Sequence, residues 1–221
     1  MKKAFDMSDL GLLYFYLSIK VRKDVSGIVL RQTHYVKHIH ELGGMIGCNP
    51  AYTPIEEKLK LSQESTVEEV DPTHYWWLIR SLHYLVHTRS DIAFAVGYMS
   101  RFMARWMMEH LKAVKRILRC VVGTLNYGLH YGRALDTARF VSYYDSDLVG
   151  DVDTSSAQLG QCFSSVIAWD CLEDGSIKDS YIATTDQLAD ILTKSLGKSK
   201  FQDMRERIGL QQITSGAQHK A

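Results

Sequence analysis

Three consecutive segments with apolar side chains at helical spacing constrain the fold of this chain more than any other feature. They cover residues 73–88, 91–103 and 109–122, and the last of them is the clearest. Its apolar face consists of Leu111, Val114, Ile117, Leu118 and Val121. The sequence is 46% apolar and 23% charged, which is ordinary for a globular protein and permits a packed core.

A hairpin and a further helix are expected before these segments. Residues 12–22 alternate loosely in polarity, a turn is expected at 23–27, and residues 28–30 return as a second strand. A helix should then run from Gln32-Thr33 to Gly43-Gly44, because a glycine pair commonly ends a helix. Residues 49–71 contain prolines with many Glu and Ser residues, which predicts a connecting loop.

After Gly123 the pattern changes to that of strands. The candidates are residues 129–131, 139–144, 162–169 and 180–183. Helices are expected at 186–195 and 200–208, and the polar tail from Gln211 is expected to be frayed. This order of elements predicts an α+β fold.

The charge balance and the cysteines limit the classes of partner and compartment. Lys and Arg together number 26 and Asp and Glu 25, so any affinity for nucleic acid requires a local basic patch. The four cysteines are scattered without a CxxC pair, which favours reduced thiols in the cytoplasm or nucleus. We expect no membrane partner, because no apolar run reaches the roughly 18 residues of a bilayer span and no signal peptide is apparent.

A basic stripe lies opposite the apolar face of residues 109–122. It consists of Lys112, Lys115, Arg116 and Arg119. Such a stripe can neutralise phosphates and would make binding depend on salt. A solvated face of an amphipathic helix is the commoner meaning of this pattern, so both interpretations stay open.

A cluster of carboxylates follows the strand candidate 139–144. Asp145, Asp147 and Asp151 lie within seven positions of one another. Carboxylates gathered at the end of a strand can bind Mg²⁺, which prefers oxygen ligands. The alternative is a solvated acidic turn without a metal.

Several blocks of sequence, in this order, resemble the Pol polyproteins of copia-type retrotransposons. Residues 7–13 read MSDLGLL and residues 16–21 read YLSIKV, like the segment that follows the aspartate motif of the polymerase. Residues 75–96, 100–103, 109–119 and 123–125 continue the resemblance. Residues 144–151 (YDSDLVGD) and 185–194 (TDQLADILTK) resemble the opening and the closing helix of the RNase H domain.

The resemblance implies a division of the chain into four parts. These are a reverse transcriptase C-terminal remnant at 1–58, a helical connection segment at 59–132, an internally deleted RNase H-like domain at 133–210 and a tail at 211–221. The implied fold is α+β, with a reverse-transcriptase-derived β-hairpin and helices followed by an incomplete RNase H-like mixed sheet with closing helices.

The resemblance also implies vestigial catalytic residues. RNase H enzymes hold Mg²⁺ with four acidic residues, of which Asp145 would be the first and Asp190 the last, with Asp147 as a further metal ligand. The second and third would fall in a stretch that is shorter here, and the polymerase aspartates would lie upstream of Asp9. Two carboxylates cannot hold two metals, so we expect vestigial sites that do not bind Mg²⁺ productively.

The expected function is therefore that of a degenerate Pol fragment without catalysis. It would bind an RNA–DNA hybrid or DNA weakly through the basic stripe, and we expect no small-molecule substrate. One alternative is a weak RNase H-type nuclease whose metal site uses Asp145, Asp147, Asp151 and Asp190. Another is a domesticated module that binds protein or nucleic acid.

Three departures from the family pattern point to decay. Arg80 and Ser18 stand where the family has Gly, and Ser90 stands where it has Pro. Arg80 is expected to force a charge toward a packed face, which would destabilise the fold unless the side chain reaches water.

Overall fold

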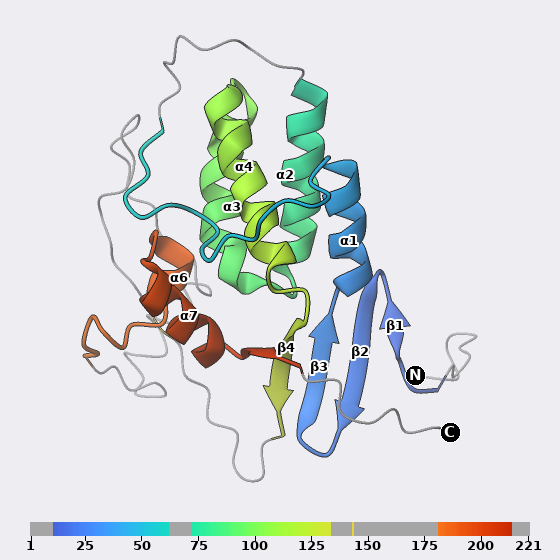
Figure 1. Ribbon diagram of the computed structural model, residues 1–221. Coiled ribbons are helices and arrows are strands. Elements are labelled where there is room, and N and C mark those ends of the chain that lie inside the picture. The colour runs from blue at the N-terminus through green and yellow to red at the C-terminus, as the bar shows by residue number, and fades with distance from the viewer. Residues whose placement is uncertain (1–10, 62–71, 134–142, 144–180, 214–221) are drawn as a thin grey trace, which may run out of the picture.

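The computed structural model describes residues 11–61, 72–133, 143 and 181–213. In these residues five short strands form one antiparallel sheet, in the order β1-β2-β3-β4-β5, and α1–α4 lie beyond one end of it (Figure 1). The strands are β1 (Phe15–Tyr16), β2 (Ile19–Asp24), β3 (Gly27–Arg31), β4 (Tyr127–Gly132) and β5 (Leu210–Gln212). The fold is α+β, as the sequence predicts.

The helices follow the predicted segments closely. They are α1 (Thr33–Leu42), α2 (Pro72–Val86), η1 (Ser90–Ile92), α3 (Ala93–Ser100), η2 (Arg101–Met103), α4 (Met108–Val122), α6 (Asp190–Thr193) and α7 (Lys198–Arg207). The segment 91–103 is thus an α-helix between two short 3-10 turns. The first closing helix is shorter than predicted, because residues 186–189 form turns before α6 begins.

The first predicted strand is in fact two strands. Residues 12–22 divide into β1 and β2, with Tyr16 paired to Ile19 across a two-residue turn. Leu17 and Ser18 form this turn with φ of 46° and 62°, the left-handed conformation of the tight turns that join twisted strands. The Tyr84 hydroxyl donates a hydrogen bond to the Leu17 carbonyl, which ties the turn to α2.

The centre and far edge of the sheet are formed by β3, β4 and β5. Gly27 allows β3 to approach β4, because a Cβ at its φ of +146° would lie 2.0 Å from the Tyr131 carbonyl oxygen. Leu210 is fully buried and pairs with Leu129. The prediction of a frayed tail is therefore wrong for Gln211 and Gln212, because pairing with β4 orders them.

Three strand candidates of the predicted RNase H-like sheet did not appear as strands. Residues 139–144 and 162–169 lie outside the described part, apart from Tyr143, which has no regular structure. Residues 181–183 of the candidate 180–183 are also irregular. The sheet that does form draws strands from the first three predicted parts of the chain, 1–58, 59–132 and 133–210.

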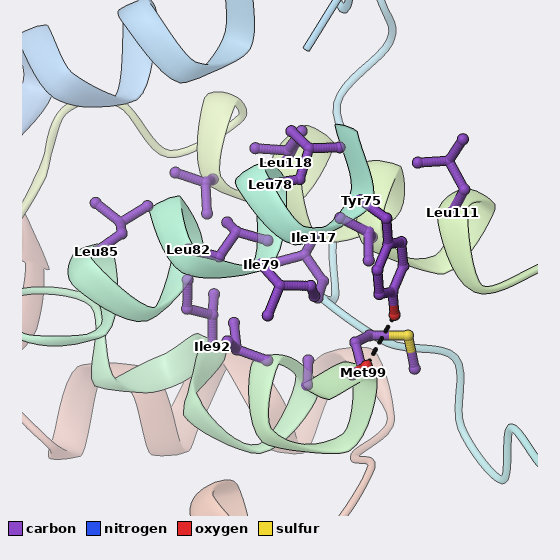
Figure 2. Packing of buried hydrophobic residues seen from close by; sticks show 14 of the residues in the cluster. Tyr75, Leu78, Ile79, Leu82, Leu85, Ile92, Met99, Leu111, Ile117 and Leu118 are labelled. Carbon is purple, nitrogen blue, oxygen red and sulfur yellow. Dashed lines mark hydrogen bonds between the residues drawn. The ribbon is translucent and has the colours of Figure 1, made fainter. Parts of the chain in front are cut away.

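The main core lies between α1, α2, α3 and α4 (Figure 2). At its centre the Tyr75 ring stacks on Trp106 with 4.9 Å between ring centroids, and the Tyr75 hydroxyl donates a 2.8 Å hydrogen bond to the Met99 carbonyl. Arg80 is exposed on α2, so the expectation that it forces a charge against a packed face is wrong. The helix turns this side chain toward solvent, where its charge carries no burial cost.

A buried ion pair joins the helices to one another. Arg89 and Asp91 form a two-pronged contact, with Nε to Oδ1 at 2.9 Å and Nη2 to Oδ2 at 2.7 Å, and their side chains are 5% and 0% exposed. Burial lowers the pKa of Arg89, but the Asp91 carboxylate outweighs this effect and raises it. The neighbouring Thr88 hydroxyl donates a 2.6 Å hydrogen bond to the Gln32 side chain at the start of α1.

A second apolar cluster attaches the C-terminal helices to α4. It contains Cys120 of α4, with Ile191, Leu196, Phe201 and Met204 from α6, α7 and the turn between them. Cys120 has no exposed surface, and burial raises the pKa of its thiol to about 12. None of the helices in the described ranges is long and apolar enough to cross a bilayer.

Replacing Ser18 with glycine should stabilise the protein. Ser18 adopts a left-handed conformation that glycine accepts without strain. We expect the Ser18→Gly variant to raise the free energy of unfolding by about 0.5–1 kcal/mol in urea titrations. Lys20→Gly in β2, where φ is not positive, is the matched control and should lower it; equal signs for the two variants would contradict the explanation.

Breaking the buried ion pair from one side should be costly. Arg89→Met leaves the Asp91 carboxylate buried without its partner, so the free energy of unfolding should fall by about 3–5 kcal/mol. The double variant Arg89→Met/Asp91→Leu should recover most of this loss, because no buried charge remains. A double variant as unstable as the single one in urea titrations would refute this account.

Candidate functional site

The four residues of the predicted basic stripe lie along α4 and differ in their surroundings. Lys112 is exposed, whereas Lys115, Arg116 and Arg119 are partly buried. Neither Lys112 nor Lys115 forms a hydrogen bond or ion pair within the described residues. The helix therefore leaves two of its four cations without a protein partner in that part of the chain.

The two arginines of the stripe hold the segment before α2 against α4. Arg116 forms an ion pair with Glu56 at 2.7 Å and donates a 3.2 Å hydrogen bond to the Thr53 hydroxyl. Arg119 donates from Nε to the Asn49 carbonyl at 2.6 Å. Part of the predicted stripe is thus used for internal packing of residues 49–56.

A surface cleft lies between this segment, α4 and the start of α7. It has a volume of about 510 Å³. Its lining includes Tyr52, Thr53, Glu57, Arg116, Arg119 and Lys198. The Lys198 ammonium stands 3.6 Å from the centroid of the Tyr52 ring, a cation–π contact. The cleft therefore brings aromatic, cationic and acidic groups together.

Asp190, the predicted last RNase H carboxylate, is held by two lysines. It is the first residue of α6 and is 1% exposed. Lys194, one turn later, places its ammonium 3.1 Å from Oδ1, and Lys200 of α7 places its ammonium 2.6 Å from Oδ2. We call this group of three residues the aspartate clasp. Both oxygens of the carboxylate already face a positive charge.

The clasp does not suit the Mg²⁺ that the family resemblance implies. A magnesium ion prefers carboxylate and other oxygen ligands, and here two ammonium groups occupy the space next to the carboxylate. Within the described residues no group of three or more His, Cys, Asp or Glu side chains could hold a metal ion. Asp145, Asp147 and Asp151 lie outside that part of the chain, so their predicted metal ligation stays a prediction.

Sequence reasoning missed several of these residues. Lys194 could have been found, because it lies four positions after Asp190 on a helix. Lys198 and Tyr52 are far apart in sequence, and Tyr52 lies in a segment that the sequence identifies only as a loop. Arg89 and Asp91 were noticed as part of a family block without a structural role.

Comparisons with known proteins place the chain among transposon sequences. Residues 1–57 match the family described as reverse transcriptase (RNA-dependent DNA polymerase). The retrovirus-related Pol polyprotein from transposon RE1 of Arabidopsis thaliana is 26% identical over 294 residues, which cover 96% of this chain and 20% of that protein. That from transposon TNT 1-94 of Nicotiana tabacum is 34% identical over 203 residues, with 84% of this chain and 15% of that protein covered.

This chain spans a fifth or less of the length of these two Pol polyproteins. An uncharacterized mitochondrial protein of Arabidopsis thaliana is 32% identical over 189 residues, which cover 83% of this chain and 77% of that protein. The search of solved structures found no significant match. From these similarities, which extend over most of its residues, the chain belongs to the family of copia-type retrotransposon Pol polyproteins and is related to reverse transcriptases.

Proposed function

We propose that this chain is a retrotransposon-derived fragment that has lost RNase H catalysis and retains weak, salt-dependent affinity for nucleic acid. The observation that carries the proposal is the aspartate clasp. In RNase H chemistry the carboxylate equivalent to Asp190 must face a metal, whereas here both of its oxygens face lysine ammonium groups. Reverse transcriptases generally use Mg²⁺, and a cation approaching this carboxylate would be repelled by two positive charges at short range.

The affinity for nucleic acid is supported by the cations of α4. Lys112 and Lys115 have no partner within the described residues, so they are available to neutralise phosphates. Each phosphate contact releases counterions and makes the affinity fall with salt concentration. Since the chain carries a net charge of only +1, we expect binding to be weak and to come from this local surface.

Incubation with a labelled RNA–DNA hybrid tests both parts of the proposal. The native chain is mixed with the hybrid in Mg²⁺ or Mn²⁺, and cleavage and fluorescence anisotropy are recorded at salt concentrations from about 50 to 200 mM. We expect no cleavage above the buffer control, together with an anisotropy increase that disappears as the salt rises.

The Asp145→Asn variant separates residual catalysis from contamination. Cleavage by the native chain that this variant loses would show a working metal site and overturn the loss of catalysis. Cleavage that is equal in both chains would come from a contaminating nuclease and would not involve the predicted site. Absence of any salt-sensitive anisotropy change would remove the nucleic-acid part of the proposal.

If the clasp is structural, removing its carboxylate should loosen the C-terminal helices. Asp190→Asn eliminates two ion pairs that connect α6 and α7, with an expected loss of about 1–3 kcal/mol in unfolding free energy. Cys120 lies beneath these helices, so its alkylation by N-ethylmaleimide should accelerate at about pH 8. Peptide mass mapping gives the labelled fraction, and the less buried Cys48 should react in both proteins.

Asp203→Asn is the matched control, because it removes a carboxylate from α7 that is 64% exposed. This variant should leave the labelling of Cys120 unchanged. If Asp190→Asn also leaves it unchanged and the unfolding free energy stays the same, the clasp does not hold the helices.

A further inference from the structure

We propose that the cleft between residues 50–57, α4 and the start of α7 binds one nucleotide unit of a single-stranded nucleic acid. The base would stack on Tyr52, and the adjoining phosphate would contact Arg119 and Lys198. This inference rests on the proposed affinity for nucleic acid and adds to it a site and a preference for single strands.

The cleft has the size for such a ligand. Its volume of about 510 Å³ lies within the range of pockets that hold small molecules of nucleotide dimensions. Its walls come from three separate parts of the chain, whose positions are fixed by the Arg116–Glu56 ion pair and by Arg119 bonded to the Asn49 carbonyl. A site built by such contacts is present before a ligand arrives, which reduces the ordering cost of binding.

Tyr52 provides the stacking surface. Its side chain is 65% exposed although it is aromatic, and Lys198 lies over its ring. An exposed aromatic ring beside cations is the common arrangement in proteins that bind single strands, because each base has a flat face that can stack. A base within a duplex is already stacked on both sides, so this ring cannot serve it equally well.

Arg119 and Lys198 provide positive charge for the phosphate. Only Nε of Arg119 is used in an internal hydrogen bond, so its two terminal nitrogens are free within the described residues. Lys198 is exposed, and its recorded contact there is with the Tyr52 ring. An arginine with both terminal nitrogens available can contact a phosphate in two-pronged fashion.

Two carboxylates in the cleft oppose an anion to different degrees. Glu56 is neutralised by Arg116 at 2.7 Å. Glu57 forms no hydrogen bond or ion pair within the described residues, and its Oε2 would lie 3.1 Å from a Cβ placed on Gly197. Glu57 therefore weakens the affinity for a phosphate, and its removal should strengthen binding.

The test is the binding of a fluorescein-labelled oligo(dT) of about 10 nucleotides to the full chain, followed by anisotropy at several salt concentrations. Tyr52→Ala should weaken binding about tenfold, whereas Tyr52→Trp should not. Arg119→Gln should lower the slope of log affinity against log salt by about 0.7, the value for one phosphate on a single strand. Glu57→Gln should raise the affinity about threefold at low salt.

Matched controls separate the cleft from the remaining surface. Tyr181→Ala removes a tyrosine that is 94% exposed outside the cleft, and Arg105→Gln removes an exposed cation before α4 begins. Both should leave the affinity unchanged, apart from a small salt-dependent effect of the lost charge. A duplex of the same length should bind more weakly than the single strand.

The outcomes distinguish this inference from the proposed function. If the native chain binds but Tyr52→Ala and Glu57→Gln do not alter its affinity, the cleft is not the site and the proposed function stands. If the native chain binds no nucleic acid, both fail. A gain of affinity in Glu57→Gln would support the cleft independently of folding defects, because an unfolded variant cannot bind more tightly through a built site.

Discussion

The two-pronged contact between Arg89 and Asp91 connects most of the described structure. It lies where α2 ends and η1 begins, and a terminal nitrogen of Arg89 reaches the Thr124 carbonyl just after α4 at 3.5 Å. The adjacent bond from Thr88 to Gln32 extends this polar network to the boundary between sheet and helices. Buried ion pairs contribute little net stability because both charges are desolvated, but they allow only one arrangement of the groups that hold them.

The sequence predicts the helices well and the strands less well, for a physical reason. The periodicity of residues 109–122 extends over four turns and is not easily mistaken, whereas β1 and β5 contain two and three residues. The loose alternation of residues 12–22 continues through the Leu17–Ser18 turn, so nothing in the pattern marks it. The cleft could not be predicted, because the meeting of Tyr52 with Lys198 depends on how the final helices pack.

The aspartate clasp and the cleft depend on the same helix. Lys200 binds the Asp190 carboxylate, and Lys198, two residues earlier in α7, lies over Tyr52. The apolar cluster under Cys120 holds this helix against α4, which also supplies Arg116 and Arg119. A carboxylate position associated with catalysis in the family thus contributes here to the position of a basic surface, provided by the same contacts that stabilise the fold.

The pairing of β5 with β4 has a consequence for the order in which the protein is made. The strand β4 ends at Gly132, and its partner ends at Gln212, about 80 residues later. At synthesis rates of roughly 5–20 residues per second, the open side of β4 waits several seconds for that partner. An unpaired strand edge can join the edge of another chain. Nascent chains on one messenger are therefore exposed to mutual pairing during this interval, and a product that stopped before Leu210 would keep that edge open permanently.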